Sequence, residues 1–316
     1  MATEKEAQIA SAVLMVRPVG FHSNPLTAPS NRFQGKTEQS DAEQQASAAR
    51  EFEGLVAALR DAGVTVIDID DTPDPPTPDS VFPNNWVTTH ADGTVVLYPM
   101  EAANRRTERR LDIVDSLAAE HGFKVTRLVD ISAHELEGRY LEGTGSLVLD
   151  RVSRVAYACL SSRTHLDALG DFAQQLDYDV VAFDAVDRDG VPIYHTNVMM
   201  SVGEGLAIVC AEAIPREEQR RAVIESLERS GHDIILLTFD QMDAFAGNML
   251  ELKSASGQRL LAMSAQAEAS LTEEQRATID AYAKIVSAPI NDIESSAGGS
   301  VRCMLAEIHL PLQDAR

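Results

Sequence analysis

The sequence predicts an α/β fold in which five β-β-α-β units surround one axis, within a single domain of residues 1–316. Five short motifs recur, and an apolar strand, a helix and a second apolar strand follow most of them. The motifs begin at residues 81, 141, 194, 245 and 296, so their starts lie 60, 53, 51 and 51 residues apart. An ordinary doubly wound fold is the alternative. It lacks support because no glycine-rich dinucleotide-binding turn runs directly into a helix.

The first unit is divided between the two ends of the chain. Apolar patterning predicts a strand at residues 12–17, a helix at 41–62 and a strand at 64–69. A final strand, residues 303–310, has no helix after it. The simplest closure pairs this C-terminal strand with the N-terminal unit, and radial repetition of this kind hides the sheet edges.

Helices in the remaining units follow from the spacing of apolar residues and from end signals. They are predicted at residues 104–121, 164–176 and 215–230, and after the N-cap residue Thr272. The strands that follow them are expected at residues 124–129, 179–183, 233–237 and 284–287. Two irregular segments, residues 20–35 and the proline-rich 71–79, are expected to form part of a lid, because loops on a rigid scaffold tend to carry ligand contacts.

The charge, hydropathy and cysteine content of the chain argue against several classes of protein. The formal net charge is −22, which argues against nucleic acid and anionic membranes as partners. No apolar run reaches about 18 residues and no secretory signal is visible, so we expect a cytoplasmic protein. The three cysteines fit neither a disulfide framework nor a zinc site. Cys159 and Cys210 lie in apolar strand-like runs and are expected in the core.

Four of the motifs carry groups useful in catalysis. Glu142 belongs to the second and His195 to the third; Cys303 follows the glycine-rich fifth, and Asn84 and Asn85 belong to the first. Singly, each has an ordinary explanation, such as a buried small thiol or a turn. Equivalent positions of a closed repeat face the axis, so we expect them to share one site. A thiol, an imidazole and a carboxylate are the groups required for nucleophilic catalysis.

The motifs resemble those of the guanidine-modifying superfamily, which includes arginine deiminases, dimethylarginine hydrolases, amidinotransferases and citrulline hydrolases. The resemblance extends along essentially the whole chain. Leu141–Gly145 resembles a Glu-Gly-Gly-Asp motif, Tyr194–Asn197 a His-x-Asp motif and Gly298–Cys303 the C-terminal nucleophile segment. It implies a five-bladed α/β propeller of the pentein type, with Cys303, His195 and Glu142 as catalytic residues and with no cofactor or metal.

The departures from the superfamily pattern indicate the substrate. Two positions that are aspartate in arginine-cleaving members are Asn85 and Asn197 here, and a third acidic position is Gly145. A guanidinium offers only donors and a charge, whereas a neutral ureido group also has an acceptor, which an amide side chain matches. Because an unpaired buried charge costs about 2 kcal/mol or more, these changes should select against arginine. Within the superfamily, the Phe-Pro-Asn-Asn-Trp, Leu-Glu-Gly-Thr-Gly and Tyr-His-Thr-Asn-Val-Met-Met set resembles the citrulline hydrolases.

The resemblance also implies contacts with the amino-acid end of the substrate. Arg163 matches an arginine that holds the substrate carboxylate, and Arg105 and Arg106 fit a second arginine position equally well. The remaining candidate contacts lie in the first motif and the first loop: Phe82, Asn84, Phe21, His22 and Asn24.

Hydrolysis of citrulline to ornithine, ammonia and carbon dioxide is the activity these features predict. Cys303 is expected to attack the ureido carbon, His195 to transfer protons and Glu142 to orient His195. The alternatives are a deiminase or hydrolase of arginine, methylated arginine or another guanidine, and a non-catalytic ligand-binding propeller. The expected partner is a small amino-acid substrate, and the chain is expected to form a homodimer.

Overall fold

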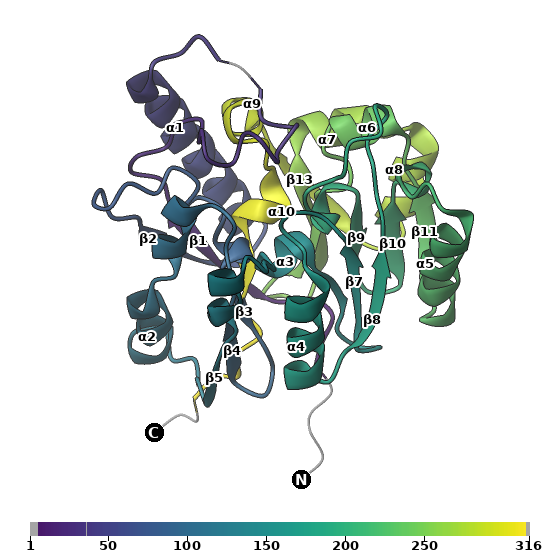
Figure 1. The fold of residues 1–316 in the computed structure, drawn as a ribbon, viewed down its shortest axis with the longest axis horizontal. Helices are drawn as coiled ribbons and strands as arrows, with labels where there is room; N and C mark the ends of the chain where they lie inside the picture. The colour runs from purple at the N-terminus through teal and green to yellow at the C-terminus, as the bar shows by residue number, and fades with distance from the viewer. Residues whose placement is uncertain (1–5, 36, 314–316) are drawn as a thin grey trace.

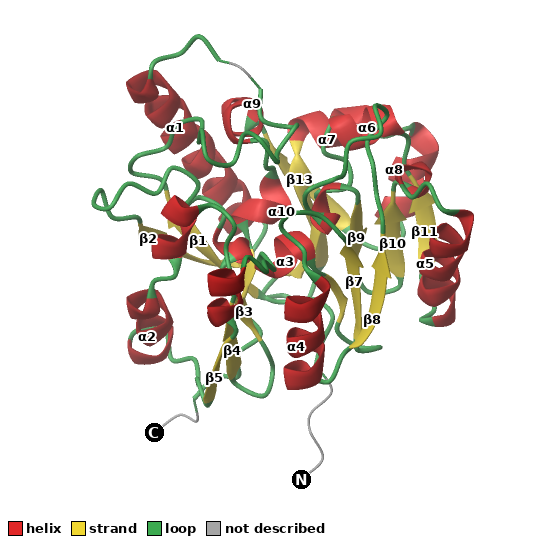
Figure 2. Ribbon diagram, in the orientation of Figure 1, coloured by secondary structure: helices red, strands yellow, loops and turns green. Residues whose placement is uncertain are grey.

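The computed structural model describes residues 6–35 and 37–313. Within these residues the strands form five three-stranded sheets of identical topology (Figures 1 and 2). In each sheet the central strand pairs antiparallel with one neighbour and parallel with the other. The strand orders are β15-β1-β2, β3-β4-β5, β6-β7-β8, β9-β10-β11 and β12-β13-β14. The predicted repeat is therefore present as a repeated strand arrangement.

The elements have the following bounds. The strands are β1 Ala12–Arg17, β2 Thr65–Asp70, β3 Val87–Thr89, β4 Thr94–Leu97, β5 Arg127–Asp130, β6 Val148–Asp150, β7 Val155–Cys159, β8 Asp179–Phe183, β9 Met200–Val202, β10 Leu206–Val209, β11 Asp233–Leu236, β12 Leu250–Lys253, β13 Arg259–Ser264, β14 Lys284–Ala288 and β15 Ala306–Glu307. The α-helices are α1 Asp41–Asp61, α2 Leu111–Ala119, α3 Gly143–Ser146, α4 Leu166–Leu176, α5 Glu217–Arg229, α6 Phe239–Asp243, α7 Ala265–Ser270, α8 Glu273–Asp280, α9 Asn291–Ala297 and α10 Val301–Met304. The 3-10 helices are η1 Pro83–Asn85, η2 Ala103–Glu108, η3 Ser132–Glu137, η4 Thr196–Val198 and η5 Ala211–Ala213.

The two ends of the chain share one sheet, as the sequence predicts. β15 pairs antiparallel with β1, with Val13 opposite Glu307, and β1 pairs parallel with β2. Helix α1 begins at the N-cap Ser40, whose hydroxyl accepts from the Glu43 amide in a capping box. Its apolar face, which includes Phe52, packs on this sheet. The longer helices α1, α2, α4 and α5 lie at the periphery, and α3 and α10 lie near the middle (Figures 1 and 2).

Two predicted elements are wrong. The helix expected at residues 104–121 is divided into η2 and α2, because Arg109, with φ −69° and ψ 83°, leaves the helical region between them. The strand expected at 303–310 is instead the helical turn α10 followed by the two-residue β15. The strand predicted at 124–129 begins three residues later, where Arg127 pairs with Thr94 of β4.

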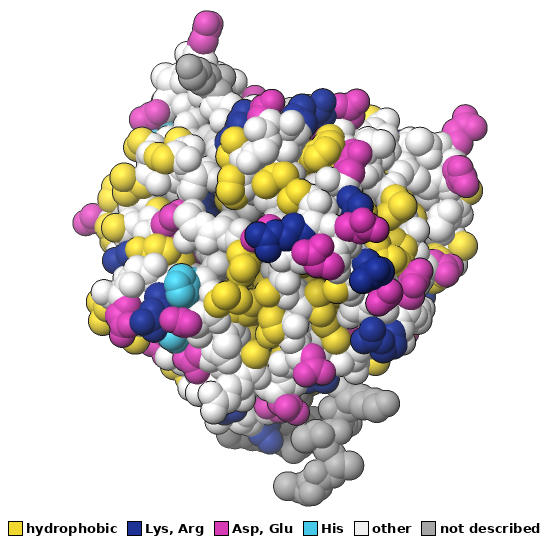
Figure 3. All heavy atoms as spheres, turned by 45° about the vertical axis from the view of Figure 1, so that its right-hand side comes forward, with side chains coloured by type: hydrophobic (Ala, Val, Ile, Leu, Met, Phe, Trp, Pro, Cys, Tyr) yellow, Lys and Arg dark blue, Asp and Glu magenta, His cyan; other side chains and the backbone are white. Residues whose placement is uncertain are grey.

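The surface mixes charges of both signs. On the face drawn in Figure 3, acidic, basic and hydrophobic side chains alternate over short distances. Exposed ion pairs contribute to this pattern, as where Arg188 meets Asp240 and Asp243. Among the helices of the described ranges, none combines the length and the apolar character needed to cross a membrane.

Candidate active site

The motif starts converge in the middle of the molecule. The short helix α3 contacts η1 and η4, and α10 contacts η1. These four turns carry Glu142, Asn85, His195 and Cys303 or lie directly beside them. Residues more than 100 positions apart in the sequence therefore share one buried region, as the repeat predicts.

Glu142 and His195 form a buried hydrogen-bonded pair. Glu142 Oε2 lies 2.9 Å from His195 Nε2, and its Oε1 accepts from the Glu101 amide at 2.9 Å. The side chains of Arg163 and Arg105 also approach Oε2, at 3.4 Å and 3.7 Å. Because Glu101, Arg163 and His195 all hydrogen-bond to the carboxylate, Glu142 is held in one orientation and positions the imidazole.

The protonation of this pair follows from burial and charge. Burial opposes ionisation of Glu142, but the charge of Arg163 and the bond to His195 outweigh it and hold the pKa of Glu142 well below its usual range. Burial lowers the pKa of His195 to about 4, although Glu142 favours the charged form. At neutral pH the pair is a carboxylate and a neutral imidazole. A carboxylate can only accept, so Nε2 carries the proton and Nδ1 is free to accept one.

Cys303 lies at the wall of a small cavity. Helix α9 ends at Gly298 in the left-handed conformation, and α10 then carries Cys303, whose exposure is 3%. His195, Phe82 and Asn85 line the same cavity. The thiol, the imidazole and a motif amide thus face one enclosed space.

The other predicted substrate residues divide into two groups. Arg105 lines the cavity, and its Nη1 donates to Asn85 Oδ1 at 2.9 Å. Arg106 instead donates to the carbonyls of Met100 and Glu101, so the structure places Arg105 rather than Arg106 in the cavity wall.

Two of the predicted amides, Asn197 and Asn84, and the predicted Arg163 lie outside the cavity lining. Asn197 donates to Cys303 Sγ at 3.4 Å, while Asn84 donates to Thr144 Oγ1 at 3.2 Å. Arg163 is bonded to the first loop, where its Nη2 donates to Thr27 O at 3.0 Å and to Ser30 Oγ at 2.9 Å.

The two irregular segments meet over the site. Asn24 of the first loop donates to Asp79 Oδ2 at 2.7 Å, and Thr27 donates to the same oxygen at 3.2 Å. Asn31 donates to Ala297 O at 2.9 Å, beside the glycine turn. Phe21 is buried in the neighbouring core. His22 bonds Gly20 O at 3.0 Å and does not line the cavity.

Asp79 and Asn248 are among the residues that reach the site without having been predicted. Asp79 lines the cavity, and its Oδ1 accepts no hydrogen bond from the described part of the chain. Asn248 donates to Cys303 Sγ at 3.3 Å. The repeat could have identified Asn248, because it is the fourth residue of its motif, the position that Asn197 occupies in its own.

Gly145 explains a departure from the superfamily pattern. A Cβ on Gly145 would lie 2.6 Å from Asn85 Nδ2 and 2.6 Å from His195 Nδ1. Asn85 and the imidazole occupy the space that an aspartate side chain would need. The glycine therefore permits this placement of His195.

Gly145→Ala should displace the imidazole and lower kcat about 100-fold, since misplacing a catalytic group by about 1 Å has that effect. Gly170→Ala is the matched control, because a Cβ at this position in α4 meets nothing within 4 Å. Steady-state kinetics on both variants checks this expectation. An active Gly145→Ala enzyme with an unmoved His195 would contradict it.

The described residues show no group of three His, Cys, Asp or Glu side chains placed to hold a metal ion. The candidate site therefore consists of a thiol, a neutral imidazole paired with a carboxylate, amides and buried arginines.

Comparison with known proteins identifies the family. The model of the eukaryotic N,N-dimethylarginine dimethylhydrolases matches residues 17–310. The chain belongs to this family. It is thus a member of the guanidine-modifying pentein superfamily and a hydrolase of the kind that uses a catalytic cysteine. No curated protein matches the sequence at a significant level.

Solved structures share the fold at low sequence identity. ArgZ, an arginine dihydrolase from the ornithine-ammonia cycle in cyanobacteria, is 18% identical with a TM-score of 0.73, covering 96% of this chain. This chain spans only 41% of the ArgZ chain. AgrE, solved as a mutant with L-arginine, is 17% identical (TM-score 0.73), covering 96% of this chain and 41% of that one. A dimethylarginine dimethylhydrolase mutant from Pseudomonas aeruginosa, complexed with citrulline, is 15% identical (TM-score 0.63), covering 95% and 99%.

Proposed function

We propose that this enzyme hydrolyses the ureido group of citrulline to give ornithine, ammonia and carbon dioxide. The observation that carries the proposal is the wall of the cavity beside Cys303, where Asn85 and Arg105 stand side by side. An amide lines the cavity where arginine-cleaving enzymes of the superfamily have an aspartate. A neutral ureido group with donors and an acceptor suits that amide.

The guanidinium of Arg105 is already paired within the wall. Arg105 is 2% exposed and fully ionised, because Glu108 and Asp79 raise its pKa above the already high value of arginine in spite of its burial. Glu108 satisfies its guanidinium at 2.9 Å. Asn85 itself carries no charge to pair with a guanidinium, whereas a ureido group needs none.

Each step of the reaction has a group in place. Cys303 Sγ attacks the ureido carbon, and the bond from that carbon to the terminal nitrogen breaks. As the sulfur attacks, His195 Nδ1 takes the proton of the Cys303 thiol and passes it to the departing ammonia. It then takes a proton from the water that attacks the S-thiocarbamate and returns it to the departing sulfur. Cleavage of the C–S bond frees the thiol and a carbamate, which loses carbon dioxide to leave ornithine. Glu142 stabilises the imidazolium during both proton transfers.

Arginine is the second candidate substrate, because Asp79 offers a free carboxylate oxygen to a cation. Its Oδ1 is buried, lines the cavity and accepts no hydrogen bond from a described residue, so it could pair with a cation. The α-ammonium group of either amino acid satisfies the same oxygen. Asp79 therefore supports an amino-acid ligand without deciding the group that reacts.

The variant Asn85→Asp tests the role of the amide. It removes the Nδ2 donor and adds a charge, so kcat/KM for citrulline should fall about 10- to 100-fold, while that for arginine stays level or rises. Gln44→Glu is the control, because it changes a buried amide of α1 that neither lines the cavity nor bonds to Asn85. It should leave the citrulline-to-arginine ratio unchanged. Equal ratios in the wild type and Asn85→Asp would refute the role of the amide.

We also propose that the five sheets are the blades of a single-domain propeller. The inner strands of neighbouring sheets touch, since β6 contacts β9, β9 contacts β12 and β15 contacts β3. Ala10 bridges to Leu252 of β12, beside the N-terminal sheet. Contacts of this kind are expected of blades around one axis.

A further inference from the structure

Two side-chain amides that are not part of the cavity lining donate to the sulfur of Cys303. Asn248 Nδ2 lies 3.3 Å from Sγ, and Asn197 Nδ2 lies 3.4 Å from it. Both asparagines are 1% exposed, and neither lines the cavity that holds the reacting face of the thiol. Their position suits interaction with the sulfur itself rather than with the substrate.

The orientation of the Asn248 amide is fixed by a second bond. Its Nδ2 also donates to Asn197 O at 2.9 Å, and only the NH₂ end of an amide can face both a carbonyl and a sulfur acceptor. Its Oδ1, like that of Asn197, is buried and accepts no hydrogen bond from the described residues. The arrangement leaves two acceptors unsatisfied and directs two donors to one sulfur.

The backbone that delivers Asn248 is strained. Phe245, three residues earlier, has φ 61°, which is rare for a bulky residue. A Cβ on Gly247 would lie 2.4 Å from Val198 O, so the turn passes against the backbone next to Asn197. Strain of this kind persists where the surrounding structure demands it, and it concentrates at functional sites.

We infer that Asn248 is a catalytic residue that, with Asn197, stabilises Cys303 as a thiolate by donating side-chain N–H bonds to Sγ. This inference rests on the proposed role of Cys303 as the nucleophile. Hydrogen bonds to the ionised form favour it, and a thiolate attacks where a thiol does not.

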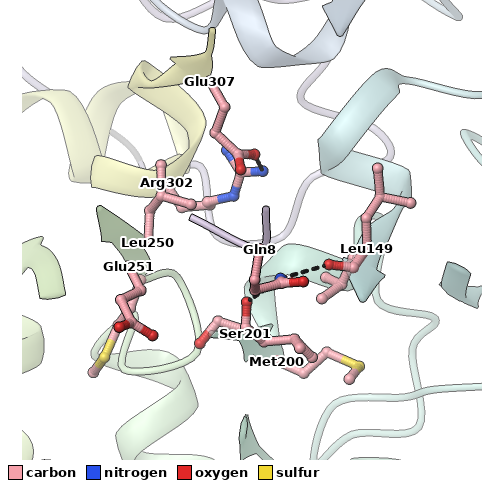
Figure 4. Close-up of a pocket in the computed structure, with 11 residues that line it drawn as sticks. Gln8, Leu149, Met200, Ser201, Leu250, Glu251, Arg302 and Glu307 are labelled. Carbon is pink, nitrogen blue, oxygen red and sulfur yellow. Dashed lines mark hydrogen bonds and ion pairs between the residues drawn. The ribbon is translucent and has the colours of Figure 1, made fainter. Parts of the chain in front are cut away.

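The positively charged side chains near the sulfur are paired with other groups, so they do not stabilise the thiolate. Arg302, the preceding residue, directs its guanidinium to Glu307 at 2.8 Å and to Leu305 O at 2.9 Å; Figure 4 shows its pairing with Glu307. Across the cavity, Arg105 is paired with Glu108.

The remaining titratable groups at the cavity do not supply a positive charge. They are Asp79, Tyr194 and His195. His195 has a lowered pKa and is neutral at pH 7, and burial raises the pKa of Tyr194 above its usual value. The groups that can stabilise a negative charge on the sulfur are therefore the neutral N–H donors of Asn197 and Asn248.

The test is the pH dependence of Cys303 alkylation by iodoacetamide, a reaction of the thiolate. Asn248→Ala should move the midpoint upward by about one pH unit, a tenfold slower reaction at neutral pH. Asn248→Asp, nearly isosteric but carrying a negative charge, should move it further. Because Asn248 does not line the cavity, kcat for citrulline should fall while KM changes little. The Cys303→Ser protein gives the background rate, and Asn291→Ala, at the exposed start of α9, is the amide-removal control.

Unchanged midpoints in both Asn248 variants would overturn the inference, and so would a lower midpoint in Asn248→Asp. If Asn248→Ala does not fold, Asn248→Asp and Asn248→Ser decide the question. The measurement needs no turnover, so it separates two failures. A shifted midpoint without citrulline hydrolysis would leave the Asn248 inference standing and remove the substrate assignment. Wild-type alkylation equal to that of Cys303→Ser would remove the nucleophile and, with it, the inference.

Discussion

Cys303→Ser should lower kcat for citrulline at least about 10⁴-fold, because a serine hydroxyl remains protonated where the thiolate would attack. Binding of citrulline should persist, since the substitution leaves Asn85 and Arg105 in the cavity wall. Ornithine release measures the first effect and isothermal titration calorimetry the second. The free energy of unfolding should change little, because the smaller hydroxyl can still accept from Asn197 and Asn248.

Cys210→Ala is the control for this variant. Cys210 is buried in a different part of the core, and burial raises the pKa of its thiol to about 12, so it stays protonated and inert at neutral pH. Its loss should cost stability but not activity per folded molecule. Comparable activity in Cys303→Ser and the wild type would exclude Cys303 as the nucleophile.

Glu142→Gln should have the second large effect, on both activity and stability. The amide can donate to Nε2 and favour the other imidazole tautomer, so kcat should fall about 10³- to 10⁴-fold. It also leaves Arg163 and Arg105 without the carboxylate that they approach at 3.4 Å and 3.7 Å. Breaking a buried pair in this way should lower the free energy of unfolding by about 3–5 kcal/mol.

The pH dependence of the stability loss has a defined sign. The pKa of Glu142 is lowered in the folded state, so its contribution to stability is present above the unfolded value of 4.5 and is lost as pH falls through the folded value. The wild type and Glu142→Gln should therefore differ most near neutral pH and converge in acid. Urea unfolding across this range measures the difference.

Glu135→Gln is the matched control for charge removal. Glu135 pairs with Arg109 at 2.8 Å outside the cavity and is also largely buried. It should lose some stability and keep its kcat. A Glu142→Gln enzyme as active as Glu135→Gln would show that Glu142 has no part in proton transfer.

The repeat could be recognised in the sequence because each unit is formed by residues that are close together along the chain. Strands and helices follow from apolar spacing and caps, and Thr272 caps α8 as predicted. Glu142, His195 and Cys303 could be predicted to share one region because they lie at or beside equivalent positions of repeated units, and such positions face the same way. Closure of the first sheet followed from the same reasoning, because β15 had no other partner among the predicted strands.

The errors arise where tertiary contacts override local patterns. A continuous helix at residues 104–121 would be apolar on one face, but Arg105 is drawn into the cavity wall to meet Asn85 and Glu108, and the chain bends after it. The helical turn at Cys303 depends on packing that local sequence patterns do not show. Asp79 could not be recognised, because its role depends on the first loop folding back to bond it.

The central claim is that the reacting group is the neutral ureido carbon of citrulline. The most direct test is to incubate the purified protein with citrulline and with arginine in parallel and to quantify all amino-acid products and ammonia. The account predicts ornithine and one equivalent of ammonia from citrulline, with arginine consumed at least about 100-fold more slowly. Unchanged citrulline, together with citrulline formed from arginine, would contradict it.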